Sequence, residues 1–212
     1  MPETTRLKQE MVEICRMMHR KGLVAATDGN VSARVGDYLL TTPSGVNKGW
    51  VKEEQIITVD LNGEVVGGSG RPTSELAMHL TVYRLRPEVQ AVVHAHPPLA
   101  TAFTIAGVSL EEQVLPEVVL NLGVILTAAY ATPSSPEVPE TIRELIKNHD
   151  ALLLERHGAV TVGADLMEAY NKMEKLEHTA LVLLMAHLLG GVRALPPEEV
   201  AKLLTLKLKM DH

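Results

Sequence analysis

Three histidines are the residues best suited to chemistry in this sequence. His94 and His96 flank Ala95 in an apolar run typical of a β-strand. Side chains two residues apart on a strand point to the same face, so both imidazoles can bind one cation. Pro97-Pro98 ends the strand and places the pair at its rim, while His157 lies at a turn between two further apolar strands. Catalytic zinc sites typically use three protein ligands and an open position. The alternative is a hydrogen-bonded core histidine at 94 and a surface histidine at 96.

An acidic residue precedes a predicted helix. Glu75 follows Thr73-Ser74, which we expect to cap a helix running to about residue 85. A first-turn carboxylate is favoured by the helix dipole, so helix stabilisation explains Glu75 as well as a chemical role does. His79 lies one turn later on the same face, and we interpret it as a core histidine rather than a partner of Glu75.

Three segments of small polar residues could hold a phosphate. They are Thr27-Asp28-Gly29-Asn30, Thr42-Pro43-Ser44-Gly45 and Pro72-Thr73-Ser74. Hydroxyl groups, an amide and free backbone N–H groups beside glycine or at a helix start bind phosphate without many cationic side chains. Turn chemistry explains each segment taken singly. Their occurrence together with a histidine cluster favours a phosphate site.

Five motifs together carry a family resemblance. They are, in chain order, Gly29-Asn30-Val31-Ser32-Ala33-Arg34, Thr42-Pro43-Ser44-Gly45, Ser74-Glu75-Leu76-Ala77-Met78-His79, His94-Ala95-His96-Pro97 and Arg156-His157-Gly158. In order and spacing they resemble the zinc-dependent class II aldolases of the L-fuculose-1-phosphate aldolase type. The same superfamily includes the L-ribulose-5-phosphate 4-epimerases and the adducin head domain. The resemblance extends from about residue 5 to residue 204.

The resemblance implies roles for particular residues. It implies that His94, His96 and His157 hold one Zn²⁺ per subunit, and that Glu75 ligates the resting zinc and swings off to act as the base. It implies a substrate-phosphate site made by Thr27, Asn30, Ser44, Gly45, Thr73 and Ser74. The implied enzyme is a class II, metal-dependent aldehyde-lyase that reversibly cleaves a phosphorylated ketose to dihydroxyacetone phosphate and an aldehyde. Its implied assembly is a homotetramer with sites between subunits.

Some features depart from that pattern and leave alternatives open. The aldolases of this type use a tyrosine in the region occupied here by Val114-Leu115-Pro116-Glu117-Val118, and another near the C-terminus; neither is present. Glu117 is a candidate for the acid on the aldehyde side, and the alternative interpretation of it is a surface carboxylate. The alternative enzymes with the same fold and motifs are a sugar-phosphate 4-epimerase and a methylthioribulose-1-phosphate dehydratase. A non-catalytic module like the adducin head is the alternative of another class, although retention of the three histidines and Glu75 argues against it. Imidazole ligands also suit manganese or cobalt.

Length and composition restrict the remaining possibilities. The 212 residues, 46% of them hydrophobic, favour one globular domain spanning 1–212. A net charge of −6 and an aromatic content of 3% argue against nucleic-acid binding. Cys15 is the one cysteine, so no intramolecular disulfide forms and a reducing compartment is favoured. The sequence shows no signal peptide and no apolar run of about 18 residues, so we expect a cytoplasmic protein without a membrane span.

The elements that must position these residues alternate between helices and strands. Helices are predicted at 4–21, 75–85, 99–106, 136–148, 165–189 and from 197; strands at 38–42, 56–59, 64–66, 89–96, 123–129, 151–154 and 159–162. Asn62-Gly63 predicts a hairpin between the second and third strands. Residues 27–34 are assigned neither helix nor strand. The pattern favours an α/β fold, a three-layer α-β-α sandwich around a mixed, mostly antiparallel sheet.

Overall fold

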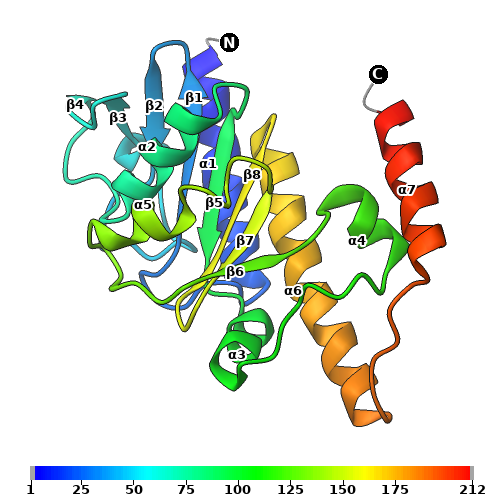
Figure 1. Ribbon diagram of the computed structural model, residues 1–212. Coiled ribbons are helices and arrows are strands. Elements are labelled where there is room, and N and C mark those ends of the chain that lie inside the picture. The colour runs from blue at the N-terminus through cyan, green and yellow to red at the C-terminus, as the bar shows by residue number, and fades with distance from the viewer. Residues whose placement is uncertain (1–2, 211–212) are drawn as a thin grey trace.

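One eight-stranded mixed sheet forms the centre of the molecule. The computed structural model describes residues 3–210. Its strands lie in the order β4-β3-β2-β1-β5-β8-β7-β6 (Figure 1). They are β1 (Asn30–Val35), β2 (Tyr38–Thr41), β3 (Ile57–Asp60), β4 (Val65–Gly67), β5 (Ala91–Ala95), β6 (Leu126–Ala128), β7 (Ala151–Leu154) and β8 (Gly158–Gly163). Only β6 and β7 pair in parallel, so the expected mixed and mostly antiparallel sheet is confirmed.

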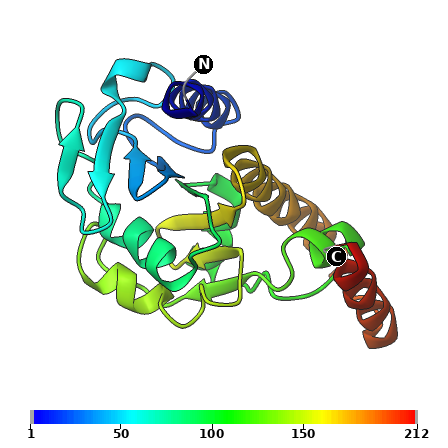
Figure 2. The same ribbon diagram turned by 90° about the horizontal axis from the view of Figure 1, so that it is seen from above.

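Helices cover both faces of this sheet. They are α1 (Glu3–Arg20), α2 (Leu76–Leu85), α3 (Pro98–Ala106), α4 (Pro116–Asn121), α5 (Glu137–Ile142), α6 (Leu166–Leu188) and α7 (Pro197–Met210), with a short 3₁₀ helix η1 at Glu53–Gln55. One hydrophobic core joins α1, α3 and α6 to one face, and a second joins α2 and α5 to the other (Figures 1 and 2). The predicted three-layer α-β-α sandwich is therefore confirmed.

Strand β1 occupies a segment to which the sequence analysis assigned no element. Val31 and Ala33 pack in the core under α1 and α6, whereas Asn30 and Ser32 are buried on the opposite face, under α2. Alternation of polar and apolar residues is the signature of a strand, and it is present in Asn-Val-Ser-Ala-Arg-Val. Gly29 and the small polar residues obscured it. The polar half of the alternation faces the helix that begins after Glu75.

Most other predicted elements lie within a few residues of their expected bounds. The Asn62-Gly63 hairpin joins β3 and β4 and carries a register shift at Thr58/Val59. The predicted helix at 136–148 was too long: α5 ends at Ile142 and turns follow. The backbone N–H of Arg143 donates to the Glu140 oxygen, three residues back, where a regular α-helix would use the oxygen four residues back. Helix α4 and η1 were not predicted.

The C-terminal part of the chain projects from the sandwich as an arm. The second half of α6 leads away from the sheet, and α7 returns to pack against α4 (Figures 1 and 2). Leucines on this arm are exposed, with Leu188 at 73% and Leu189 at 85% of their maximal accessible surface. Among residues 3–210, no helix is long and apolar enough to cross a membrane.

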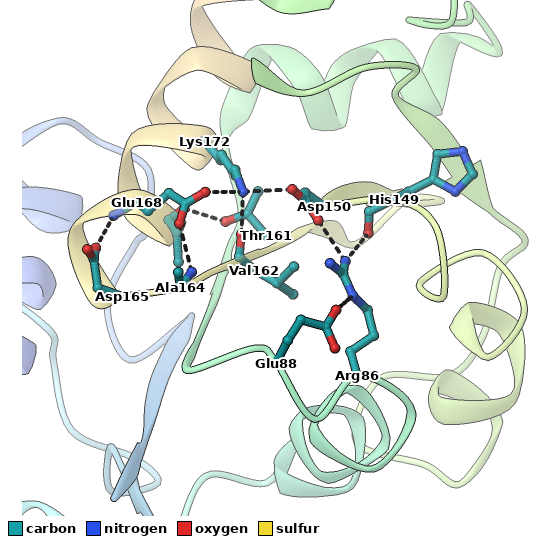
Figure 3. A network of polar contacts seen from close by, with 11 residues as sticks. Arg86, Glu88, His149, Asp150, Thr161, Val162, Ala164, Asp165, Glu168 and Lys172 are labelled. Atoms are coloured by element: carbon teal, nitrogen blue, oxygen red, sulfur yellow. Dashed lines mark hydrogen bonds and ion pairs between the residues drawn. The ribbon is translucent and has the colours of Figure 1, made fainter. Parts of the chain in front are cut away.

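A network of ion pairs ties α6 to the sheet (Figure 3). The ammonium group of Lys172, 9% exposed, lies 2.7 Å from carboxylate oxygens of both Asp150 and Glu168, and donates to the Val162 carbonyl oxygen. Asp150 also accepts a 2.7 Å hydrogen bond from Arg86, which pairs with Glu88. The network lies at the end of β8 that is remote from His157.

Candidate active site

Strand pairing brings the three histidines together. His94 is on β5 and His96 follows it, while His157 lies in the turn between β7 and β8. Strands β5 and β8 are antiparallel with Ala95 opposite Ala159, so the end of β5 adjoins the start of β8. Each pair among the three imidazole rings has its centroids 4.9 Å apart. The histidine cluster expected from the sequence is therefore one compact group.

Glycine is required beside this group. A Cβ at Gly158 would overlap the backbone oxygen of Ala95 and would stand 2.9 Å from the ring of His96. Any larger residue would force β8 away from β5 and separate His96 from His157. The Arg156-His157-Gly158 motif thus has a packing reason in addition to its chemistry.

Glu75 completes the cluster from the opposite helix layer. It is the N-cap residue of α2, and one donor atom from each of Glu75, His94, His96 and His157 lies within 4.8 Å of all the others. Its Oε2 lies 2.9 Å from Nε2 of His94, and its Oε1 lies 3.3 Å from Nε2 of His157. The carboxylate is 8% exposed, so it faces the imidazoles rather than solvent.

The hydrogen bonds of the cluster leave electron pairs without a partner. Nδ1 of His94 donates to the Ala159 carbonyl oxygen at 2.9 Å, which leaves the lone pair on its Nε2. That nitrogen lies 3.0 Å from Nε2 of His96. Oε1 of Glu75 is buried and receives no hydrogen bond from residues 3–210. Converging lone pairs and an orphaned carboxylate oxygen fit a bound divalent cation, because a cation would satisfy all of them.

The electrostatics of the site keep these side chains in forms that are able to bind a metal. Burial, together with the neighbouring His94 and His157, lowers the pKa of His96 to about 3. The pKa of His157 is also lowered, mainly by burial. Burial alone would raise the pKa of Glu75, but His94, His157 and the Asn30 amide outweigh it and hold this pKa well below its usual range. Both imidazoles are thus neutral and the carboxylate is charged near pH 7.

The predicted phosphate-binding segments meet beside this cluster. The Thr73 N–H donates to the Thr42 oxygen, and the Ser44 N–H donates to the Arg71 oxygen, so residues 42–45 run alongside residues 71–74. Thr27, Ser44, Gly45 and Ser74 are exposed at the surface. The remaining two members, Thr73 and Asn30, are buried. Oγ1 of Thr73 accepts from the Glu75 N–H, and the side chain of Asn30 bonds to Glu75 and His79.

Several polar residues near the site were not identified from the sequence. Lys48 is 1% exposed, and its ammonium group donates to the Thr27 and Val46 carbonyl oxygens at 2.9 and 2.8 Å. It therefore links the predicted phosphate segment that begins at Thr27 to the residue that follows the segment ending at Gly45. Oδ2 of Asp28 lies 3.6 Å from Nδ1 of His96, beside the cluster formed by the three histidines and Glu75. A lysine five residues after a proline and an aspartate before a glycine give no local signal of these positions.

The fold and the site together define a class of metal-binding enzymes, and comparison with known proteins gives the family. The model of the Class II Aldolase and Adducin N-terminal domain family matches residues 9–184. The chain belongs to this family, and it is a metal-dependent lyase. The resemblance drawn from the five motifs is thereby confirmed.

Individual relatives divide between two activities. The L-fuculose phosphate aldolase of Methanococcus maripaludis strain S2 is 39% identical over 171 residues, 81% of this chain and 92% of that protein. The 3-oxo-tetronate 4-phosphate decarboxylase of Pectobacterium atrosepticum is 32% identical over 205 residues, 93% of this chain and 92% of that protein. Among solved structures, an L-fuculose 1-phosphate aldolase superposes with a TM-score of 0.87 at 27% identity, covering 98% of this chain and 97% of its own.

Proposed function

We propose that this protein is a zinc-dependent aldolase that reversibly cleaves a phosphorylated ketose, similar to L-fuculose 1-phosphate, into dihydroxyacetone phosphate and an aldehyde. The observation that carries the proposal is the convergence of His94, His96 and His157 on the buried carboxylate of Glu75, whose Oε1 receives no hydrogen bond from residues 3–210. Three imidazoles and a carboxylate suit Zn²⁺. The relative named L-fuculose phosphate aldolase supports the substrate class.

The proposed reaction divides the chemistry between the cation and Glu75. A zinc ion held by the four residues would polarise the substrate carbonyl and stabilise the negative charge that develops as the carbon–carbon bond breaks. The electron pair of that bond stays on the carbon next to the carbonyl, while the hydroxyl on the departing carbon passes its proton to a water molecule and becomes the aldehyde oxygen. Glu75 takes up a proton from water and delivers it to the carbon that keeps the pair, and it removes that proton in the reverse direction. That carbon becomes the hydroxymethyl carbon of dihydroxyacetone phosphate.

The phosphate group is proposed to bind beside the zinc ligands. The proposed set is Thr27, Asn30, Ser44, Gly45, Thr73 and Ser74. Support is strongest for the four exposed members, because the side chains of Asn30 and Thr73 bond within the protein. The buried ammonium group of Lys48 lies under the same loops and adds positive potential where a dianion would bind. Binding of the phosphate, which does not react, would hold the substrate carbonyl in position for reaction.

Assembly and location are part of the proposal. We propose one domain over residues 1–212, a cytoplasmic homotetramer and active sites between subunits. The exposed leucines of the α6–α7 arm support association, because this apolar surface gains from burial. Sedimentation of a fully active monomer would contradict the assembly.

Decarboxylation of a 3-oxo acid phosphate is the second candidate. The relative named a 3-oxo-tetronate 4-phosphate decarboxylase aligns over 93% of this chain, against 81% for the named aldolase. A carboxylate leaves as CO₂ without any proton transfer to or from the leaving group. In aldol cleavage, by contrast, a residue or water must accept the proton of the departing hydroxyl. The absence of a tyrosine from residues 114–118 therefore favours this candidate. Cleavage of 3-oxo-tetronate 4-phosphate leaves the same electron pair on the same carbon, and protonation again gives dihydroxyacetone phosphate.

One assay separates the candidates. The zinc-loaded protein is incubated with ketose 1-phosphates that differ at C3 and C4, and separately with 3-oxo-tetronate 4-phosphate. Dihydroxyacetone phosphate with an aldehyde supports the aldolase, and dihydroxyacetone phosphate with CO₂ supports the decarboxylase. An epimer or a dehydrated ketone as the product would overturn both. The Glu75→Gln variant measures the background rate.

A further inference from the structure

A line of buried side chains leads from the interior of the sandwich to Glu75. The Tyr83 hydroxyl lies 2.9 Å from Oγ of Ser32, which lies 2.6 Å from Nδ1 of His79. Nε2 of His79 lies 2.5 Å from Oδ1 of Asn30. The Asn30 amide nitrogen donates to Oε2 of Glu75 at 3.0 Å. All five residues are less than 9% exposed.

The direction of every hydrogen bond in this line follows from the carboxylate at its end. Glu75 is an acceptor only, so the Asn30 amide must present its nitrogen to it and its oxygen to His79. The Asn30 oxygen can only accept, so Nε2 of His79 carries the proton and Nδ1 carries the lone pair. Ser32 must then donate to Nδ1, and its oxygen accepts from the Tyr83 hydroxyl. Four hydrogen bonds are thus donated in one direction, towards the carboxylate.

Backbone geometry explains why these residues match one another. Glu75, His79 and Tyr83 are four residues apart and share one face of α2, where four residues rise about 6 Å. Asn30, Ser32 and Arg34 are two residues apart and share one face of β1, where two residues rise about 6.6 Å. Because the rise of about 6 Å along α2 nearly equals the rise of about 6.6 Å along β1, each of these α2 side chains lies next to a β1 side chain. Arg34 continues the match, with its guanidinium 5.1 Å from the Tyr83 ring centre.

We infer that His79, Ser32 and Asn30 are positioning residues that hold Glu75 by its Oε2 and so orient its carboxylate towards the three imidazoles. If the Asn30 amide reversed, its oxygen would face a carboxylate oxygen, and the fixed proton on His79 prevents that reversal. Donors outside the ligand shell that orient a ligand commonly change metal affinity or activity 10–100-fold when removed. The role of Glu75 as base rests on the proposed function, whereas the orientation of its carboxylate does not.

The first test measures the proton on His79 directly. The full chain, freed of metal by a chelator and labelled with ¹⁵N at histidine, is examined by NMR at pH 7. His79 is assigned by the signals that disappear in the His79→Gln variant. We expect one fixed tautomer with the proton on Nε2 and none on Nδ1. A proton on Nδ1, or an average of the two tautomers, would overturn the inference.

The second test measures Zn²⁺ affinity by competition with a chelator, for variants whose folding is checked by circular dichroism. His79→Leu removes the donor to Asn30, and we expect affinity to fall about 10–100-fold. His79→Gln keeps an N–H near the position of Nε2 and should restore most of that loss. Thr81→Val, a buried residue of α2 outside the line, should bind like the parent. Parent-like affinity in His79→Leu, or an equal loss in His79→Gln, would contradict the inference.

A third variant covers the case in which His79→Leu does not fold. Ser32→Ala removes the hydroxyl that donates to Nδ1 of His79, so the ring loses one of its two hydrogen bonds. We expect the proton to stay on Nε2, where the Asn30 oxygen holds it, and zinc affinity to fall by less than in His79→Leu; unchanged affinity would overturn the inference. These readouts need no substrate. Absence of any carbon–carbon cleavage alongside the expected affinities would therefore remove the proposed function and leave the positioning role intact.

Discussion

Two polar clusters lie at opposite ends of the strand pair β5–β8, and they are built on different principles. At one end, Lys172 and Arg86 each contact carboxylates at 2.7 Å, so every buried charge has an opposite charge beside it (Figure 3). At the other end, one carboxylate faces three imidazoles, and one of its oxygens receives no hydrogen bond from residues 3–210.

The difference separates a structural cluster from a binding site. Burying a charge is costly unless it is paired, and the Lys172 network meets that need within the chain. The histidine cluster meets it only when a cation is supplied from outside. Both clusters contain strongly polar residues in an apolar sandwich, so polarity alone does not mark the site. The histidine cluster differs from the Lys172 network because it has more nitrogen and oxygen lone pairs than protons or cations to bind them.

The largest expected effect is loss of the metal. His94→Ala removes a ligand at the centre of the cluster, and bound metal should fall from one per chain to nearly none. The fold should persist, because the two apolar cores do not depend on the metal. Elemental analysis and circular dichroism measure the two outcomes. His178→Ala changes an exposed histidine of α6 and should keep the metal; equal loss in both variants would argue against the assigned ligands.

The next effect concerns Glu75 as a base. In Glu75→Gln, turnover at saturating zinc should fall roughly 10²–10⁴-fold, because the side chain keeps its size but cannot take a proton. Exchange of the hydroxymethyl proton of dihydroxyacetone phosphate with deuterium isolates this step from cleavage. As a mere first-turn carboxylate, Glu75 would contribute at most about 1 kcal/mol to stability and little to activity. Parent-like exchange in the variant would remove Glu75 from the mechanism.

Lys172 tests the other side of the comparison. Lys172→Met leaves Asp150 and Glu168 without their shared cation, and the free energy of unfolding should fall by about 3 kcal/mol. Metal content should stay at the parent level, because the network lies at the far end of β8. Denaturant unfolding and elemental analysis measure the two quantities. The double variant Lys172→Met/Asp150→Asn should recover part of the stability; metal loss in either variant would break the separation of the two clusters.

The last prediction separates the clusters by pH, and over one pH unit its effect on stability is smaller than that of Lys172→Met. Burial lowers the pKa of His79 from 6.5 to about 3 in the folded protein, so below pH 6.5 the unfolded chain binds a proton that the folded chain does not. The metal-free protein should therefore lose stability between pH 6.5 and 3, by up to about 1.4 kcal/mol per pH unit from this group. The pKa of Asp150 lies below its usual 3.8, since Lys172 and Arg86 outweigh the effect of burial, so its contribution is lost only in stronger acid. Unfolding of the parent and His79→Gln across this range compares the slopes; equal slopes between pH 6.5 and 4 would contradict the assignment.

The sequence determined the parts of this protein whose signals are local. Period-two spacing in His94-Ala95-His96 and the Asn62-Gly63 turn predicted a strand rim and a hairpin that the structure contains. The five ordered motifs predicted the family, and the alternation of helices and strands predicted the sandwich. The missed β1 strand also had a local signal, in the alternation of residues 30–35.

Only the tertiary structure decided how distant segments meet. Glu75 and His157 are 82 positions apart in the sequence, and their carboxylate and imidazole come within 3.3 Å because β5 pairs with β8 while α2 packs across β1. The sequence suggested Asn30 for phosphate and His79 for the core, whereas the fold joins both to Glu75. Hydrogen-bond direction and burial depend on which side chains face each other across layers. Propensity and spacing along one segment carry no information about the register between segments, and that register sets the geometry of the site.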